Sequence, residues 1–251
     1  MNVVAIIQAR MGSTRLPEKA LKKIHGKTIL WHIINRINHS KFIDDVIIAC
    51  TINNEDKAIE DFAKKNFIKV YRGSVDDIVD RFYNAAKKVD ADIIIRLWGD
   101  CPLVDPELID KALKVFIEKG LDYSNNFNPP SYPAGLNFEI YSIKTLETIL
   151  INTKDPFFRE YPFEYVYAFE KSFKTYYAKN KKNLSSINLT VDYQQDFELI
   201  SKIFEKLSKK DEIFYLDDIV NLINKNPELQ SLNIDLKRNI EYERDKKKRQ
   251  T

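Results

Sequence analysis

Short runs of apolar residues alternate with amphipathic segments through the first 120 residues of the chain. The short runs are typical of strands buried in a sheet, and the amphipathic segments place apolar side chains at helical spacing. We expect strands at residues 3–7, 46–50, 68–71 and 92–97. We expect helices at residues 28–38, 54–65, 75–89 and 106–119, with Asn54 as the N-cap of the second. Strands separated by helices of this length predict right-handed crossovers and a parallel sheet.

The pattern changes beyond residue 120, where aromatic and turn-forming residues become frequent. We expect strands at residues 137–141, 173–178 and 187–191, helices at 143–150, 194–207 and 216–224, and a partly helical aromatic segment at 157–169. The tail at 237–249 is highly charged, and we expect it to be frayed or weakly helical and solvated. The whole predicts one α/β domain over residues 1–235, with an inserted subregion at about 123–185 and a charged tail at 236–251.

Composition narrows the class of protein. The net charge is +3, from 40 cations and 37 anions, whereas a dedicated nucleic-acid binder usually carries a strong basic excess. No apolar run has transmembrane length, and no basic segment precedes the first strand as it would in a signal peptide. Cys50 and Cys101 lie in or beside apolar segments, which is typical of reduced, buried thiols. We therefore expect a cytoplasmic protein without a nucleic-acid or membrane partner.

Three cations, Arg10, Arg15 and Lys19, stand in a small loop directly after the first expected strand. Gly12 and Ser13 allow the backbone of this loop to approach a ligand, so that its N–H groups can face an anion. Arginine offers a planar set of donors that suits phosphate oxygens. A surface turn with solvated charges would also fit. We favour a phosphate site, because open α/β sheets bind ligands at the carboxyl ends of their strands.

Two carboxylates also follow expected strands. Asp100 stands on a glycine-backed turn after residues 92–97, and Asp192 ends residues 187–191. Mg²⁺ prefers one or two carboxylates together with water and substrate phosphates, so Asp100 can hold this ion beside the first loop. Asp192 fits equally well as a second carboxylate for the same ion or as the N-cap of the next helix. Asp105 is expected to cap a helix, and Asp196 to be a surface acid near a helix N-terminus.

Taken together, the loop at 8–19, the turn at 99–103 and the strand end at 190–192 resemble, in this order, the cytidylyltransferases that activate acidic sugars. These include the acylneuraminate and 3-deoxy-manno-octulosonate enzymes, and the resemblance is strongest to their spore-coat polysaccharide branch and spans nearly the whole chain. It implies a three-layer, Rossmann-like α/β fold of the nucleotide-diphospho-sugar transferase type, with a mostly parallel sheet. It also implies an inserted dimerisation and acceptor subregion, a homodimer, and the use of CTP and Mg²⁺.

The resemblance assigns roles to individual residues. It implies that the nucleotide contacts Gln8, Ala9, Arg10, Gly12, Ser13, Arg15, Lys19, Arg96 and Gly99, and that Arg10, Arg15, Lys19 and Asp100 are catalytic. It implies that Asp100 and Asp192 hold Mg²⁺, and that Asn126, Gly135, Glu139, Arg159 and Glu160 bind the acceptor. Two departures fall on the acceptor side: Tyr161 stands where a histidine is usual, and Ala134-Gly135 where an arginine is usual. The sequence therefore leaves the acceptor open.

The expected reaction is transfer of CMP from CTP to an acidic, nonulosonic-acid-like sugar or a related polar acceptor, with release of pyrophosphate, in surface polysaccharide synthesis. Alternatives are a nucleotidyltransferase that uses another nucleotide or a phosphorylated or phosphonate acceptor, and a nucleotide sensor without catalysis. A type-A glycosyltransferase is a further alternative, although the turn at Asp100 lacks the second aspartate, two residues on, that those enzymes use to hold a metal ion.

Overall fold

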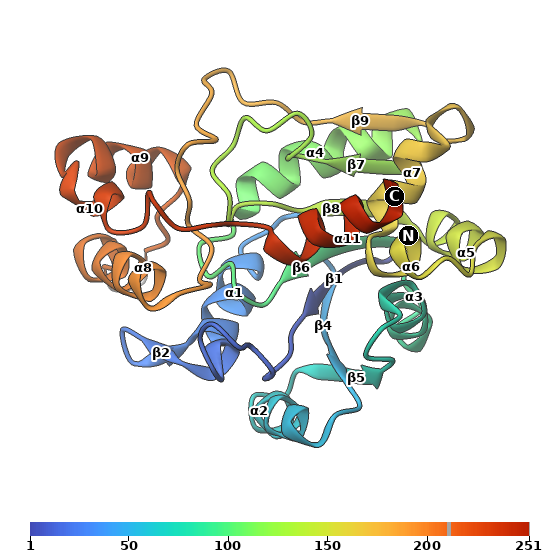
Figure 1. Cartoon of the computed structure of the whole chain (residues 1–251), viewed down its shortest axis with the longest axis horizontal. Helices are drawn as coiled ribbons and strands as arrows, with labels where there is room; N and C mark the ends of the chain where they lie inside the picture. The colour runs from blue at the N-terminus through green and yellow to red at the C-terminus, as the bar shows by residue number, and fades with distance from the viewer. Residues whose placement is uncertain (210–211, 251) are drawn as a thin grey trace.

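The computed structural model describes residues 1–209 and 212–250, and a mixed sheet forms its centre (Figure 1). The seven strands lie in the order β5-β4-β1-β6-β8-β7-β9. Their bounds are β1 Val3–Gln8, β4 Asp45–Thr51, β5 Lys69–Gly73, β6 Ile93–Trp98, β7 Tyr123–Asn125, β8 Glu139–Ser142 and β9 Thr175–Tyr177. The first four are parallel neighbours, β8 is antiparallel to β6 and β7, and β9 is parallel to β7. The expected mostly parallel sheet is confirmed.

Helices cover both faces of this sheet and make it the middle of three layers. Alternate residues of β1 belong to different cores, with Val3, Ala5 and Ile7 on one face and Val4 and Ile6 on the other. The first face packs against α1 Ile29–Ile37, α2 Lys57–Lys65, α4 Pro106–Lys119, α8 Gln194–Leu207 and α9 Leu216–Lys225. The second face packs against α3 Ile78–Lys88, α5 Ile143–Asn152, α6 Pro156–Glu160 and α7 Pro162–Ala168. The three-layer α/β fold is therefore confirmed.

Short elements and the C-terminal region complete the chain. They are the hairpin β2 Lys23–Ile24 and β3 Lys27–Thr28, the 3₁₀ turns Lys19–Leu21, Asn54–Asp56 and Glu170–Ser172, and the helices α10 Glu228–Ser231 and α11 Ile240–Gln250. Figure 1 shows the chain leaving α10, crossing the front of the molecule and ending in α11 beside α6. None of the described helices is long and apolar enough to cross a membrane.

Two local expectations are wrong. The segment at 187–191 is not a strand, because it forms only one isolated bridge, between Asn188 and Ala134. Its alternating pattern has another cause: Ile187, Leu189 and Val191 are buried while the backbone hydrogen-bonds to loops. Asn54 does not cap α2, since a 3₁₀ turn intervenes and the helix begins only at Lys57.

The tail was expected to be frayed or weakly helical and solvated, and among the described residues it is helical but makes contacts with other helices. Residues 240–250 form α11, which packs on the helix α6 and, through Tyr242, on Phe163 of α7. Lys246 pairs with Glu164 at 3.0 Å, and Arg249 pairs with Asp155 at 3.0 Å while lying over the ring of Phe158. These partners on other helices explain why a strongly polar segment is ordered as a helix.

Candidate active site

One lysine ammonium group joins the three segments that the sequence analysis singled out. Lys19 Nζ lies 2.7 Å from Asp100 Oδ2 and 2.8 Å from Asp192 Oδ1. Lys19 opens a short 3₁₀ turn in the loop after β1, Asp100 follows β6, and Asp192 precedes α8. Because β1 and β6 are parallel neighbours, their following loops meet at the same edge of the sheet. The fold thus brings two carboxylates from distant segments to one cation.

The charges at this point reinforce one another. Burial alone would lower the pKa of Lys19, but the negative charges of Asp100 and Asp192 outweigh burial and raise this pKa above its ordinary value. Burial alone would raise the pKa of Asp192, but Lys19 and Arg15 outweigh it and hold this pKa below its usual range. At neutral pH the site therefore contains a charged ammonium group and an ionised Asp192 in direct contact.

Arg15 adds a second cation to the same carboxylate. Its Nη2 donates to Asp192 Oδ1 at 2.9 Å, and its guanidinium carbon lies 5.3 Å from the centre of the Tyr193 ring. The Nε of Arg15 is buried and, among residues 1–209 and 212–250, has no hydrogen-bond partner. A buried donor without an acceptor is uncommon in folded proteins and can mark a place for a ligand. Arg15 is thus held beside Asp192 through Nη2, and its Nε–H group remains available to donate a hydrogen bond to a ligand.

Hydrogen bonds from outside the loop fix its conformation. The N–H of Met11 donates to Oδ1 of the fully buried Asp56 at 2.6 Å, and the other oxygen of Asp56 accepts from the backbone N–H and hydroxyl of Thr51. Within the loop, Ser13 Oγ accepts from the N–H of Leu16 at 3.4 Å. Gly12 is exposed at the loop surface. Asp56 is not among the residues predicted for this site, because its distance from the loop along the sequence gives no sign of the contact.

The loops after β1 and β6 touch at Gly99. Its N–H donates to Gln8 O at 2.8 Å. A Cβ atom on Gly99 would lie 2.9 Å from Gln8 O and 3.2 Å from the Cα of Ala9, so glycine is required for this approach. Gly99 thereby sets the distance between the loop of cations and Asp100.

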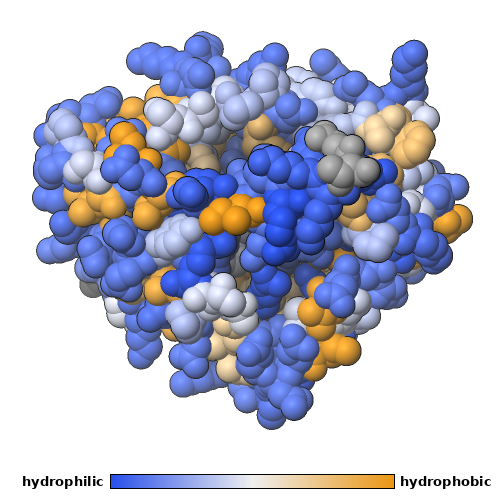
Figure 2. All heavy atoms as spheres, in the orientation of Figure 1, coloured by the Kyte–Doolittle hydropathy of each residue, from blue (hydrophilic) through white to orange (hydrophobic). Residues whose placement is uncertain are grey.

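Arg10 turns away from the carboxylates that bind Lys19. Its side chain is about half exposed, and its Nη2 lies 3.4 Å from Glu241 Oε2 on α11. Figure 2 shows that the surface over α11 is strongly hydrophilic. Of the three loop cations, Arg10 is therefore the one paired at the surface, while Lys19 and Arg15 lie deeper.

Arg96 was expected to bind the nucleotide and Glu139 the acceptor, but in the structure the two side chains are bonded to each other. Arg96 Nη1 lies 2.8 Å from Glu139 Oε2, and both side chains are almost completely buried. Arg96 also donates to Gln8 Oε1 at 2.9 Å, while Tyr123 and Tyr141 donate their hydroxyl protons to Glu139 Oε1. These bonds occupy both carboxylate oxygens. The nucleotide role of Arg96 and the acceptor role of Glu139 stay predictions.

The two members of the Arg159-Glu160 pair face different neighbours. Arg159 donates to Asp77 Oδ2 at 2.8 Å and to Leu150 O at 3.0 Å, and so is bound to α3 and α5. Glu160 is half-buried, and burial raises its pKa against the opposing charges of Arg96, Arg81 and Arg10. Glu160 therefore lies within electrostatic range of Arg10 in the loop after β1, whereas Arg159 holds the outer helices together.

Asn126 and Gly135 shape the loop between β7 and β8. Asn126 is buried, donates to Leu136 O and accepts from the N–H of Phe138, both at 2.9 Å. Gly135 has φ +92°, and a Cβ there would lie 2.4 Å from the carbonyl carbon of Leu189. The loop before Asp192 can pass this close only because residue 135 is glycine. Their roles toward an acceptor stay predictions.

The structure corrects the expectation for Asp196. It is not a surface acid, because its side chain is fully buried and accepts hydrogen bonds from Asp192 N at 3.0 Å and Tyr193 N at 2.9 Å. An acid on the first turn of α8 was visible in the sequence, but Arg238 and Asn233, which also bind Asp196, lie far along the chain. Asp105 caps α4 as expected, through the N–H groups of Glu107 and Leu108.

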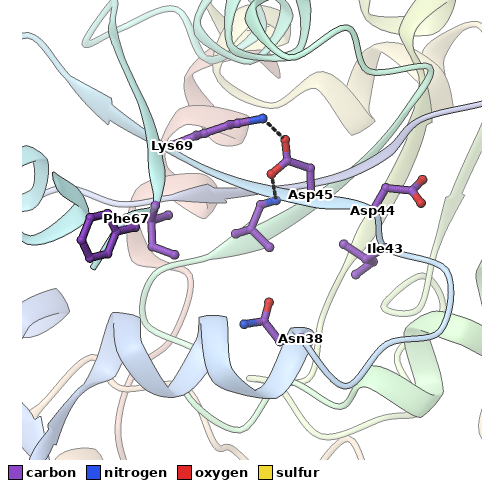
Figure 3. Close-up of a pocket in the computed structure, with 8 residues that line it drawn as sticks. Asn38, Ile43, Asp44, Asp45, Phe67 and Lys69 are labelled. Carbon is purple, nitrogen blue, oxygen red and sulfur yellow. Dashed lines mark hydrogen bonds and ion pairs between the residues drawn. The ribbon is translucent and has the colours of Figure 1, made fainter. Parts of the chain in front are cut away.

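The carboxylates fit a divalent cation. Asp100 and Asp192 already converge on one positive group, and the residues that the structure describes contain no cluster of three or more metal-ligating side chains. Two carboxylates leave most of an octahedral shell to water and phosphate oxygens, as Mg²⁺ prefers. A separate hollow of about 210 Å³ lies at the amino ends of β4 and β5. Its lining includes Asp45 and Lys69, which neutralise each other (Figure 3). That hollow lies at the opposite edge of the sheet.

Comparison with known proteins identifies the family. The model of the cytidylyltransferase family matches residues 4–240. The chain belongs to this family. It is 36% identical over 237 residues to an uncharacterized protein of Methanocaldococcus jannaschii, which covers 93% of this chain and 95% of that one. It is 30% identical to the spore coat polysaccharide biosynthesis protein SpsF of Bacillus subtilis, over 90% of this chain and 96% of SpsF.

Further matches agree with this assignment. A cytidylyltransferase structure from Leptospira borgpetersenii superposes with a TM-score of 0.88 at 33% identity, over 94% of this chain and 99% of that one. The 3-deoxy-manno-octulosonate cytidylyltransferase of Pelobacter propionicus is 35% identical over 118 residues, 47% of this chain and 46% of that enzyme. The expected membership is confirmed, and the protein is a CTP-dependent nucleotidyltransferase of the Rossmann-like fold.

Proposed function

We propose that this cytidylyltransferase transfers CMP from CTP to an acidic, nonulosonic-acid-like sugar, releases pyrophosphate and serves surface polysaccharide synthesis. The observation that carries the proposal is the Lys19 ammonium group held between Asp100 and Asp192. SpsF and the 3-deoxy-manno-octulosonate enzymes, which the chain resembles, support the class of acceptor. We further propose that the enzyme is a cytoplasmic homodimer that requires Mg²⁺.

The loop after β1 would bind the triphosphate. Arg10, Arg15 and Lys19 would neutralise the β- and γ-phosphates, on which negative charge develops as pyrophosphate leaves. Gly12 and Ser13 would let backbone N–H groups approach the same oxygens. Catalysis is then mostly positioning and charge stabilisation, because phosphoryl-type transfer needs little covalent chemistry from the protein.

Asp100 and Asp192 would hold Mg²⁺. Bound there, the ion would supply Lewis-acid stabilisation of the α-phosphate and lower the pKa of an acceptor hydroxyl. Asp100 and Asp192 would supply two carboxylates held at the carboxyl ends of the strands. Lys19 would turn from these carboxylates to a phosphate oxygen when the triphosphate binds. Membership of the cytidylyltransferase family favours this chemistry over a type-A glycosyltransferase.

Pyrophosphate release tests the proposal. The protein is incubated with each of the four nucleoside triphosphates, Mg²⁺ and a panel of acidic sugars, phosphorylated sugars and phosphonates. We expect release with CTP and an acidic sugar, and its loss in Asp100→Asn but not in the control Asp61→Asn, whose exposed carboxylate pairs with Lys57 on α2. Release with a phosphorylated or phosphonate acceptor alone would overturn the acidic-sugar assignment. Binding of CTP without release for any acceptor would favour a sensor.

A further inference from the structure

A cluster of buried polar side chains holds the backbone of Asp192, whose carboxylate contacts Lys19. Its centre is Asp196, whose side chain is fully buried. Oδ2 of Asp196 accepts from Asp192 N, Tyr193 N and Arg238 Nη1, and Oδ1 accepts from Arg238 Nη2 and Asn233 Nδ2, both at 2.7 Å. Asp196 therefore binds the backbone of Asp192 with one oxygen and the C-terminal segment with both.

Arg238 is the cation that neutralises this carboxylate. Its two terminal nitrogens meet the two oxygens of Asp196 in a bidentate pair, with both distances at 2.7 Å. Nη2 also donates to Asn233 O at 3.3 Å, and the hydrogen-bond pattern assigns the amide oxygen of Asn188 to the same guanidinium group. A planar guanidinium group suits this geometry, and a lysine could not reproduce it.

The cluster reaches Asp192 through its peptide N–H. Asp192 presents its carboxylate to Lys19 while its N–H is held by Asp196. The next residue back, Val191, donates its N–H to Asp100 O at 2.9 Å, so the two site carboxylates share one backbone framework. A buried carboxylate that loses its cation is strongly destabilised, so without Arg238 the side chain of Asp196 would turn away from its present position. That movement would weaken the hydrogen bond that the N–H of Asp192 donates to Asp196.

We propose that Arg238 is a positioning residue that fixes Asp192 through Asp196, so that the C-terminal segment completes the metal site. The inference rests on the proposed function, in which Asp192 holds Mg²⁺. The same segment continues to Glu241, which pairs with Arg10 of the nucleotide loop. Residues behind metal ligands typically change metal affinity or activity by about 10- to 100-fold when they are replaced.

The test uses the full-length variants Arg238→Ala, Arg238→Lys, Asp196→Asn and the Arg238→Ala/Asp196→Asn pair. Arg244→Ala is the matched control, because Arg244 is an exposed residue of α11 whose one ion pair among the described residues is with its neighbour Asp245. Three quantities are measured: the Mg²⁺ concentration for half-maximal pyrophosphate release, the dissociation constant of Mn²⁺ by electron paramagnetic resonance, and CTP affinity in EDTA.

We expect Arg238→Ala to raise both metal constants by about 10-fold or more, with CTP affinity in EDTA changed less than 2-fold. Arg238→Lys should recover part of the loss, Arg244→Ala should match the wild type, and the double variant should be no worse than Asp196→Asn, since both residues act along one path. Melting temperatures identify variants that fail to fold. If Arg238→Ala does not fold, the metal constants of Arg238→Lys and Asp196→Asn are compared with those of the wild type instead.

Unchanged metal constants in a folded Arg238→Ala variant would overturn the inference and leave the proposed function intact. Additive losses in the double variant would also overturn it, because they would show two independent effects. A wild-type protein that releases no pyrophosphate with CTP would instead contradict the proposed function, and the Mn²⁺ titration would still decide the role of Arg238. Absence of Mn²⁺ binding by the wild type would overturn both.

Discussion

Two groups of opposite charges lie at the carboxyl edge of the sheet, and they differ in how completely they are satisfied. Arg96 and Glu139 form a fully buried pair in which two tyrosines and Gln8 take the remaining bonds. Lys19 is shared between two carboxylates that stay partly accessible to solvent. The first group is closed and supports the fold. The second can exchange its cation, as a site that receives a triphosphate and a metal ion must.

Glu139→Ala should produce the largest effect, and it should be on stability. Removing one member of a buried ion pair leaves Arg96 charged and unpaired, which costs about 3–5 kcal/mol. Urea unfolding followed by circular dichroism measures the change in the free energy of unfolding. A variant as stable as the wild type would show that the Arg96–Glu139 pair is not the closed support described here.

Lys19→Met should affect catalysis far more than folding. Loss of a cation that stabilises charge in the transition state should lower kcat by about 10²- to 10³-fold. Without CTP, the variant should bind Mn²⁺ more tightly than the wild type, because the ammonium group no longer occupies the place between Asp100 and Asp192. Lys23→Met, at the exposed position of strand β2, is the control. Weaker Mn²⁺ binding in Lys19→Met would contradict an exchangeable cation.

Arg15→Ala should weaken nucleotide use with any acceptor. The guanidinium group is charged, partly buried and bonded to Asp192, so its removal should cost about 1.5–3 kcal/mol, or roughly 10-fold or more in kcat/KM for CTP. Steady-state kinetics at saturating acceptor measures this. Unchanged CTP kinetics would remove the loop after β1 from the triphosphate site.

The smallest expected effect is on the pH dependence of stability. Asp192 has a folded-state pKa below its ordinary value of 3.8, so its ion pairs stabilise the protein above this pH and are lost as the pH falls through the lower, folded value. The difference in unfolding free energy between the wild type and Asp192→Asn should be about 1 kcal/mol near neutrality and shrink below pH 3.8. A difference that grows on acidification would contradict the sign of this shift.

The sequence predicted the site where simple rules of strand geometry apply. Asp100 follows β6 and Lys19 lies in the loop after β1, and parallel neighbouring strands bring the loops that follow them together. Asp192 follows a segment that is not a strand, so its place at the site came from the family resemblance and not from strand geometry. Arg238 could not be found in this way, because it lies 42 residues beyond its partner Asp196 in a segment whose charges are typical of a solvated tail. Only the folded chain shows that Arg238 binds the buried Asp196 and that Lys246 pairs with Glu164 on α7.

The alternation of apolar and polar residues was least informative where a loop has the same pattern as a strand. The alternating residues 187–191 match a strand, but their burial comes from packing between two loops that Gly135 allows to touch. Arg159 and Glu160 are adjacent in the sequence, yet successive residues of a helix point about 100° apart. Their side chains therefore have different neighbours, which the sequence could not reveal.

Titration of the wild-type protein with Mn²⁺, with and without CTP, tests the central claim most directly. Electron paramagnetic resonance reports the free ion, and the Asp100→Asn/Asp192→Asn double variant is the comparison. We predict a site whose affinity for Mn²⁺ rises when CTP is present and which is lost in the double variant. Equal binding by the double variant, or binding that CTP does not change, would contradict a metal-assisted triphosphate site at Lys19.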